Sequence, residues 1–420
     1  MDIATKTGRI RIVNDAKPGE MTESNPEKPG RISVSMLWRE PFRLFFPAAV
    51  CAGLTGVLLW PLHFSGLAPF YPGTSHARLM GHGFFGGFIV GFLGTAVPRM
   101  VSARPLGLIE AAGLLTVYVL MVALHACGFT AGGDLALLTL LALLATFLLR
   151  RFATRTDLPP PGFVLLPIAF AAVITGILLD RFTPQDGDGL TAFRLGMPRL
   201  LMYQGFVLLP IMAVGPFLFP RFFGKKSDHD LPESASPTRE WIGKALIAAA
   251  AGTLVVGSFL IEAQGWTRSG HLLRFCVVLG YFILQSPVFR SGRPKDRFAR
   301  SLKTGSALLA LGFLAVSFAP IYRVALLHLT LVGGAATITI SVATRVIFGH
   351  SGNHGLLSQR NRWFTVASVF MYVGMLTRVS GDFWPKIMIS HYNYGAIFWG
   401  GGLLIWAWHV IPKVLISDPD

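Results

Sequence analysis

Long runs of apolar residues recur along the chain from Pro41 onward. Each is about 18 to 22 residues long, the length that a helix needs to cross about 30 Å of hydrocarbon. Stretches such as residues 135–149 are apolar on every face, unlike the short alternating strands of a closed β-barrel. The pattern predicts twelve membrane-spanning helices, at residues 41–62, 77–98, 106–127, 133–150, 162–180, 197–219, 242–262, 270–289, 302–319, 322–348, 362–380 and 391–412.

The segments outside these runs are short, with two exceptions. Residues 1–36 carry mixed charge and no sustained apolar period, so we expect a disordered cytoplasmic tail before a single twelve-helix membrane domain at 37–420. This leading segment is too long and too acidic for the basic region of a cleaved signal peptide, which predicts a retained first span. The charged loop at 221–241 follows the sixth span and predicts two six-helix halves, although no repeat between them is evident.

Composition supports the membrane assignment, and charge adds an orientation. Apolar residues make up 52% of the 420 positions, charged residues 14%, and the mean hydropathy is +0.56. If the N-terminus is cytoplasmic, about three quarters of the 37 Lys and Arg residues fall on the inner side. We therefore expect an all-α polytopic protein of the bacterial inner membrane with both termini cytoplasmic. The net charge of +16 is dispersed over short loops, which does not indicate a nucleic-acid partner.

Histidine is the residue type that carries candidate chemistry. The three cysteines form no CxxC or CxxCH pair, which argues against covalently attached haem and iron–sulfur clusters. Most of the eleven histidines fall within or at the ends of spans, where an ionisable group needs a partner, a water-lined cavity or a metal. The predicted topology places them in two tiers: His76, His82, His125, His271, His328 and His391 toward the outer side, and His350, His354 and His409 toward the inner side.

Spacing limits which histidines can share a site. His76 and His82 lie about 240° apart around a helix, so each would need ligands from another helix. His328 and His350 lie nearly on one helix face but about 33 Å apart along the axis. Imidazole is a common ligand of non-covalent haem and also suits copper. A lone histidine at a span end can equally be interfacial or bonded to a backbone carbonyl.

Two further features admit both a functional and a structural explanation. In the second span, Gly83, Gly87 and Gly91 recur at four-residue steps, which permits close approach of a helix or of a flat macrocycle. Several arginines lie near predicted outer span ends and either neutralise an anionic ligand or extend toward the interface: Arg78, Arg199, Arg274, Arg323 and Arg378. Buried carboxylate pairs and nucleotide or hydrolase motifs are not evident.

Two long strings resemble elements of the NnrS family, haem- and copper-containing membrane proteins of the bacterial nitric-oxide response. Residues 75–100, SHARLMGHGFFGGFIVGFLGTAVPRM, resemble the family's WHAHEMLFGFA…GFLLTAVPNW, and His76 matches its first histidine. Residues 327–352, LHLTLVGGAATITISVATRVIFGHSG, resemble LHALTVGAVGTMTLAVMTRVSLGHTG, where His328 and His350 match. PFRLFF at 41–46 and GPFLFPRFF at 215–223 are shorter resemblances.

The chain also departs from the family pattern at the start of the second span. Arg78 and Leu79 stand where the family has a second histidine and a glutamate. His82 stands where the family has phenylalanine, one turn from the lost histidine, and could substitute for it. These departures put the metal complement in question, copper more than haem.

The resemblance implies a haem-binding, and in second place copper-binding, integral membrane protein that helps bacteria withstand nitric oxide or nitrosative stress. His76 and His328 are then the first candidates for metal ligands, and His350, His82 and His391 are further candidates for binding the cofactor. Expected partners are the lipid bilayer and nitric oxide, and no catalytic residue is assigned. Two alternatives stay open: a di-haem electron-transfer protein or nitric-oxide-reducing enzyme, and a cofactor-free secondary transporter whose histidines relay protons.

Overall fold

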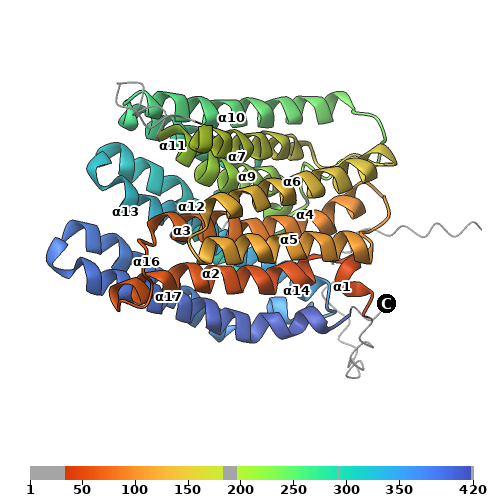
Figure 1. Cartoon of the computed structure of the whole chain (residues 1–420). Coiled ribbons are helices and arrows are strands. Elements are labelled where there is room, and N and C mark those ends of the chain that lie inside the picture. The colour runs from red at the N-terminus through yellow and green to blue at the C-terminus, as the bar shows by residue number, and fades with distance from the viewer. Residues whose placement is uncertain (1–33, 183–195, 287, 291–293, 295, 418–420) are drawn as a thin grey trace, which may run out of the picture.

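The chain folds into long helices that lie side by side (Figure 1). The computed structural model describes residues 34–182, 196–286, 288–290, 294 and 296–417, and within them helices are the only regular secondary structure. The all-α expectation is therefore confirmed. In chain order the elements are α1 (Met36–Arg39), α2 (Phe42–Phe64), α3 (Gly73–Arg78), η1 (Leu79–Phe85), α4 (Gly86–Met100), α5 (Leu108–Ala126), α6 (Thr130–Ala153), η2 (Pro161–Val164), α7 (Leu165–Phe182), η3 (Leu200–Gly205), α9 (Phe206–Phe222), α10 (Arg239–Ala263), α11 (Thr267–Gln285), α12 (Arg297–Phe318), η4 (Pro320–Tyr322), α13 (Arg323–His328), η5 (Leu329–Ala336), α14 (Thr337–Gly349), α15 (Gly355–Ser358), α16 (Arg362–Phe383), η6 (Pro385–Ile387), α17 (Met388–Val410) and η7 (Ile411–Leu415).

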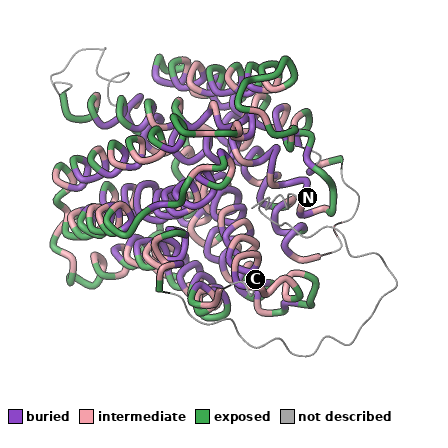
Figure 2. The backbone as a smooth tube through the Cα atoms, turned by 90° about the vertical axis from the view of Figure 1, so that its right-hand side faces the viewer, coloured by how far each residue is buried: buried purple, intermediate pink, exposed green. Residues whose placement is uncertain are grey.

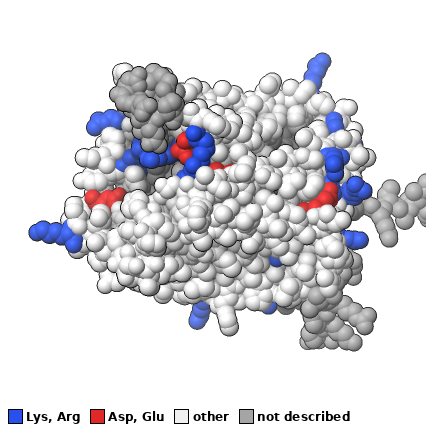
Figure 3. Space-filling model, viewed as in Figure 1, with Lys and Arg blue, Asp and Glu red and all other residues white. Residues whose placement is uncertain are grey.

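Eleven spans in the described residues are long and apolar enough to cross a membrane. The predicted eighth span is α11, which lies outside this set and carries Arg268, His271 and Arg274 in its first turns. Large apolar side chains such as Leu135 and Leu246 are about two-thirds exposed on the helix surfaces, as contact with lipid requires. Figure 3 shows charged side chains mostly toward the two ends, with an uncharged band between them. Of the predicted tail, residues 1–33 lie outside the described residues.

Three spans form the inside of the bundle. In the numbering of the twelve predicted spans, they are the second, sixth and tenth. Each contains a π-helical stretch, namely η1, η3 and η5, and such stretches frequently occur at functional sites. The second and sixth spans are the most buried, with 83% and 89% of their apolar windows inside the protein, against 61% for the tenth. Their helices α4, α9 and α14 surround a shared apolar centre lined by Phe88, Ile211 and Val342. Figure 2 shows the buried backbone in the middle of the bundle and exposed backbone at its periphery.

The other helices pack around these three in a repeated order. One helix precedes each inner span and lies against it: α2 against α4, α7 against α9, and α12 against η5 and α14. A helical hairpin follows each inner span: α5 with α6, α10 with α11, and α16 with α17. The loop between α9 and α10, at residues 223–238, lies where the sequence predicts a cytoplasmic link. The division into two six-helix halves stays a prediction.

The glycine stripe of the second span is a packing surface for α2. A Cβ atom on Gly83 would lie 2.9 Å from the Cβ of Ala52, and one on Gly87 would lie 2.7 Å from the Cβ of Ala49. Gly91 is equally tight, because its Cβ would lie 3.0 Å from the Cα of Phe42. Real Cβ atoms do not approach this closely, so glycine is what lets the two backbones meet.

Arg43 ties the two ends of the membrane domain together. Its guanidinium donates to the carbonyl oxygens of Val414 (2.6 Å), Ile416 (2.7 Å) and His350 (2.6 Å), and to the carboxylate of Glu40 (2.6 Å). The start of α2 and the end of η7 therefore lie at one end of the bundle, which we call the terminal end. The opposite end is the distal end. The side of the membrane that each end faces stays a prediction.

Glu40 completes this network and makes it sensitive to pH. The ring Nδ1 of His350 donates to Glu40 Oε1 (2.9 Å), and Arg99 also bonds this carboxylate. Burial alone would raise the pKa of Glu40, but the hydrogen bond from His350 and the charges of Arg99 and Arg43 lower it from 4.5 to about 2. Burial in turn lowers the pKa of His350, so its ring is neutral at pH 7.

We expect the folded protein to lose stability as the pH falls from about 4.5 toward 2. Because the pKa of Glu40 is lower in the folded state, its contribution is fully present above the unfolded value and disappears in that window. The loss attributable to this group is on the order of 3 kcal/mol. Thermal unfolding of the detergent-solubilised protein between pH 7 and pH 3 measures it. The Glu40→Gln variant should lose less over the same range, and equal losses in both proteins would contradict the assignment.

Candidate functional site

A large cavity opens among the distal ends of the helices. Its volume is about 1400 Å³, which exceeds the 300 to 1,000 Å³ typical of pockets for drug-sized ligands. Residues of all three π-helical stretches line it, including Met80, Tyr203 and Leu331. Aromatic side chains close its wall on the side of α2 and α17: Trp60, Tyr392 and Trp399. We call this space the distal cavity.

His76 and His328 both line the distal cavity. His76 ends the first turn of the second span, and its Nδ1 lies 2.9 Å from the carbonyl oxygen of Gly56 on α2. His328 is the last residue of α13, and its Nδ1 lies 2.8 Å from the carbonyl oxygen of Val324. A carbonyl oxygen only accepts, so each ring carries its proton on Nδ1 and leaves the Nε2 lone pair free. Metal-ligating histidines usually have this arrangement, with the second nitrogen held by a carbonyl or carboxylate.

The cavity wall carries excess positive charge. Five arginines and two carboxylates line it: Arg78, Arg181, Arg199, Arg323, Arg378, Asp180 and Glu262. Four of these arginines have carboxylate partners: Arg78 bonds Asp180 (2.9 Å), Arg323 bonds Glu262 (3.0 Å), Arg378 bonds Asp382 (2.8 Å) and Arg181 bonds Asp134 (2.5 Å). Arg199 is exposed to the cavity and pairs with no carboxylate among the residues that the structure describes. The cavity therefore suits a ligand that carries negative charge.

A histidine, a carboxylate and an arginine lie together near the distal tip of each of the three helical hairpins. In chain order these sets are His125, Asp134 and Arg78 (the last from α3), then Glu262, His271 and Arg274, then Arg378, Asp382 and His391. In the second set, the Nε2 of His271 lies 3.2 Å from Glu262 Oε2. In the third, the Nδ1 of His391 instead lies 2.8 Å from the hydroxyl of Ser380.

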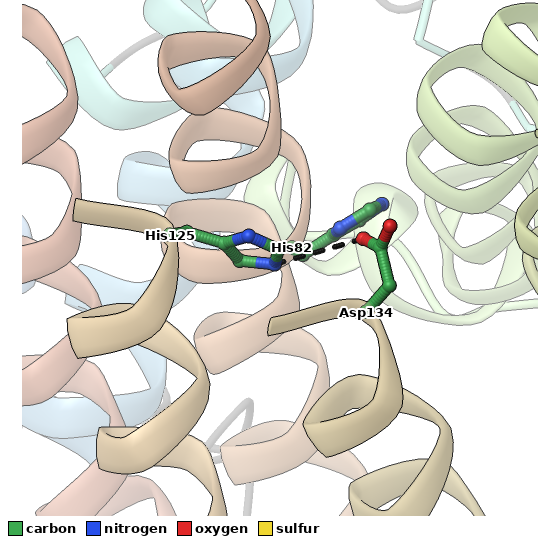
Figure 4. Close-up of side chains that lie close together, drawn as sticks. All are labelled: His82, His125 and Asp134. Carbon is green, nitrogen blue, oxygen red and sulfur yellow. Dashed lines mark ion pairs between the residues drawn. The ribbon is translucent and has the colours of Figure 1, made fainter. Parts of the chain in front are cut away.

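The first set differs from the others because the inner span adds another imidazole, that of His82 (Figure 4). Donor atoms of His82, His125 and Asp134 all lie within 4.8 Å of one another, and the Nε2 of His125 is 3.9 Å from Asp134 Oδ1. Both histidines are fully buried, and Asp134 is 1% exposed. None of the four ring nitrogens makes a hydrogen bond of normal geometry among the described residues, although the backbone of Met202 lies near the ring of His82. We call these three residues the 82/125/134 cluster.

Arg78 and Arg181 both reach the carboxylate of this cluster. Arg78 bonds Asp134 with two nitrogens, at 2.7 and 2.9 Å, and is itself buried. Arg181 bonds the same carboxylate at 2.5 Å, and its side chain is 32% exposed. The residue that replaces the family's second histidine is therefore the main partner of Asp134. Leu79, which replaces the glutamate, is fully buried.

The structure brings together some of the predicted site residues and separates others. His76 and His328, matched through the family resemblance, share the distal cavity. His82 faces His125, with ring centroids 6.0 Å apart, in the adjoining 82/125/134 cluster. His391 lies at the distal end against Ser380, and His350 lies at the terminal end against Glu40. Sequence reasoning did not group Asp134 with any histidine, although its charge beside an apolar run was a visible signal.

Comparison with known proteins agrees with the resemblance found in the sequence. A protein-family model described as "NnrS protein" matches residues 36–417, which is nearly the whole chain. No curated protein matches the chain.

Proposed function

The chain belongs to the NnrS family, and from this premise we propose that it is a haem-binding protein of the bacterial inner membrane that acts in the response to nitric oxide and nitrosative stress. The haem would lie in the distal cavity, with His76 and His328 as ligands of its iron. The observation that supports this most directly is the pair of cavity-lining imidazoles whose Nδ1 atoms are bonded to carbonyl oxygens. This leaves two Nε2 lone pairs, from two separate spans, as ligands.

The cavity wall matches the rest of such a group. A haem combines a flat apolar macrocycle with two carboxylates. Apolar side chains of the wall, such as Phe85, Met375 and Trp399, would cover the macrocycle. Arginines of the wall would pair with the carboxylates, and Arg199 is exposed for this role without breaking an ion pair among the described residues.

A second, apolar cavity adjoins the distal cavity. A smaller cavity of about 80 Å³ lies between α4, α9 and α14, and it shares Phe85 and Val207 with the distal cavity. Its lining is almost entirely apolar, and such spaces hold apolar guests rather than water. A small uncharged gas such as nitric oxide fits this environment. A haem in the distal cavity would supply an iron that could bind nitric oxide in place of one of the two histidine ligands, and the protein would orient the haem and shield it from water.

One absorption spectrum with metal counting tests this proposal. The protein is purified in detergent, and its ultraviolet-visible spectrum is recorded in oxidised and reduced form beside elemental analysis. We expect a Soret band, about one iron per chain, and a shift of the band when nitric oxide is added to the reduced protein. Copper with no Soret band would move the assignment from haem to copper. Neither Soret band nor metal would contradict the proposal and favour the cofactor-free transporter.

The same preparation separates the di-haem alternative. Two irons per chain, together with quinol-dependent turnover of nitric oxide, would indicate an electron-transfer protein or a reductase. One iron without turnover indicates a binding protein.

A further inference from the structure

We propose that the 82/125/134 cluster is a second metal site, which takes a divalent first-row transition ion. It does not depend on the proposed haem function, because neither histidine of the cluster lines the distal cavity. Two imidazoles and one carboxylate are a donor set for Zn²⁺, Cu²⁺ or Fe²⁺, and not for Mg²⁺ or Ca²⁺, which prefer oxygen alone.

The strongest reason is that the two imidazoles are buried without partners. His82 and His125 have no exposed surface, and their four ring nitrogens make no hydrogen bond of normal geometry among the described residues. A buried polar group without a partner destabilises the folded protein. A metal ion would bind one lone pair from each ring and remove part of this destabilisation.

The geometry of the cluster requires only side-chain adjustment to hold an ion. In a tetrahedral site with bonds of about 2.0 to 2.1 Å, donor atoms lie about 3.4 Å apart. The donors of the cluster lie within 4.8 Å, and one histidine–carboxylate pair is already at 3.9 Å. His125 and Asp134 sit on neighbouring helices of one tight hairpin, which fixes their separation, and His82 faces them from η1. Small rotations of the three side chains would close the gap.

Gly133 leaves the space that the ring of His125 occupies. Any Cβ at position 133 would overlap the ring of His125. Glycine therefore lets the imidazole lie directly against the start of α6, one residue before Asp134. The contact holds the ring beside the carboxylate and away from lipid.

At this hairpin the inner span supplies a metal-binding side chain, His82. At the hairpin of α10 and α11, the inner span instead contributes Gln204, whose side-chain oxygen accepts from Arg274 at 2.5 Å. There Arg274 also bonds Glu262, so the interior is filled by an ion pair. At the 82/125/134 cluster, the two imidazoles lie with their ring centroids 6.0 Å apart.

Two arginines would compete with the ion for Asp134, so their charge should weaken metal binding. Arg78 keeps a second carboxylate, Asp180 at 2.9 Å, when it releases Asp134. Arg181 is 32% exposed and can turn toward water. An incoming divalent ion would displace Arg181 first, because its side chain is partly exposed and water can solvate its charge, whereas Arg78 is buried. Removing the charge of Arg181 should therefore tighten metal binding.

The test is a titration of the full-length protein in detergent, free of any affinity tag and treated with a chelator. Zn²⁺ binding is measured by calorimetry, and Co²⁺ binding by its visible absorption, which reports tetrahedral coordination. We expect one high-affinity site in the wild type. His82→Phe and Asp134→Asn should each weaken it on the order of 100-fold, and Arg181→Gln should tighten it several-fold. His409→Ala is the control, because this exposed histidine lies at the terminal end.

The unfolding temperature and the Soret band of His82→Phe separate loss of the metal site from misfolding and from loss of haem. His82→Phe replaces a buried polar side chain by an apolar one, so its unfolding temperature should be no lower than that of the metal-free wild type. Its Soret band should also be unchanged, which separates this site from the proposed haem site. Absence of a high-affinity Zn²⁺ or Co²⁺ site in the wild type would overturn the proposal. An unchanged affinity in folded His82→Phe and Asp134→Asn would overturn it as well.

Discussion

Replacing His328 by alanine is expected to weaken haem binding by at least tenfold, as an order of magnitude, while expression stays close to wild type. The side chain lines the distal cavity, and among the described residues it bonds the carbonyl oxygen of Val324 in its own helix. Removing it deprives an iron of one ligand but breaks only one local bond, worth about 1 kcal/mol. The haem-to-protein ratio of the purified variant measures the effect.

A matched control makes this result specific to the cavity. His409 makes the same bond to the carbonyl four residues earlier, that of Ile405 at 2.9 Å, but lies at the terminal end against Trp363. His409→Ala should therefore leave haem content unchanged. Any haem retained by His328→Ala would lack one of its proposed iron ligands, and added imidazole should restore the wild-type spectrum. Equal haem content and an unchanged spectrum in both variants would remove His328 from the site.

Replacing Arg43 by methionine should lower the free energy of unfolding by about 3 to 5 kcal/mol. The guanidinium is buried and bonds three carbonyl oxygens and one carboxylate, which come from three separate places in the chain. Methionine fills a similar volume but donates no hydrogen bond, so Glu40 and the carbonyl oxygens of Val414 and His350 would be left without this donor. The unfolding temperature of the detergent-solubilised protein measures the loss.

Arg39→Met is the control for this substitution. Arg39 lies four residues earlier on α1 and is exposed. Its loss removes the same charge without uncovering a buried acceptor, so we expect little change in unfolding temperature. Arg43→Lys should fall between the two, because one ammonium cannot reach all four acceptors. If Arg43→Met unfolds at the same temperature as Arg39→Met, the network does not tie the chain ends together.

The apolar runs predicted the helix boundaries closely for spans that consist of a single uninterrupted α-helix. The run predicted at 242–262 is the apolar part of α10, Arg239–Ala263, and the run at 302–319 is that of α12, Arg297–Phe318. Apolar content did not predict the π-helical stretches within the inner spans. A π-helical turn is wider than an α-helical turn, and packing against neighbouring helices decides where it forms.

The candidate site was predictable in part, and mainly from the family resemblance. His76 and His328 matched family strings, whereas their spacing alone left them among several histidines at span ends. From the sequence, the glycine stripe of the second span could admit either a neighbouring helix or a flat macrocycle. Its contacts with α2 favour the neighbouring helix. The meeting of His125 with Asp134 was missed because helix rotation decides which side chains on neighbouring helices face each other.

By itself, the sequence determined that this chain is a polytopic helical protein and which family it resembles. Each span must satisfy its own backbone hydrogen bonds in hydrocarbon, so its length and apolar content are local properties that the sequence shows directly. Only the tertiary structure decided which histidines share a cavity, which arginines face it, and that His82 meets His125 and Asp134 in the interior. Those pairings depend on the rotation and depth of helices far apart in the chain, and no local pattern records them.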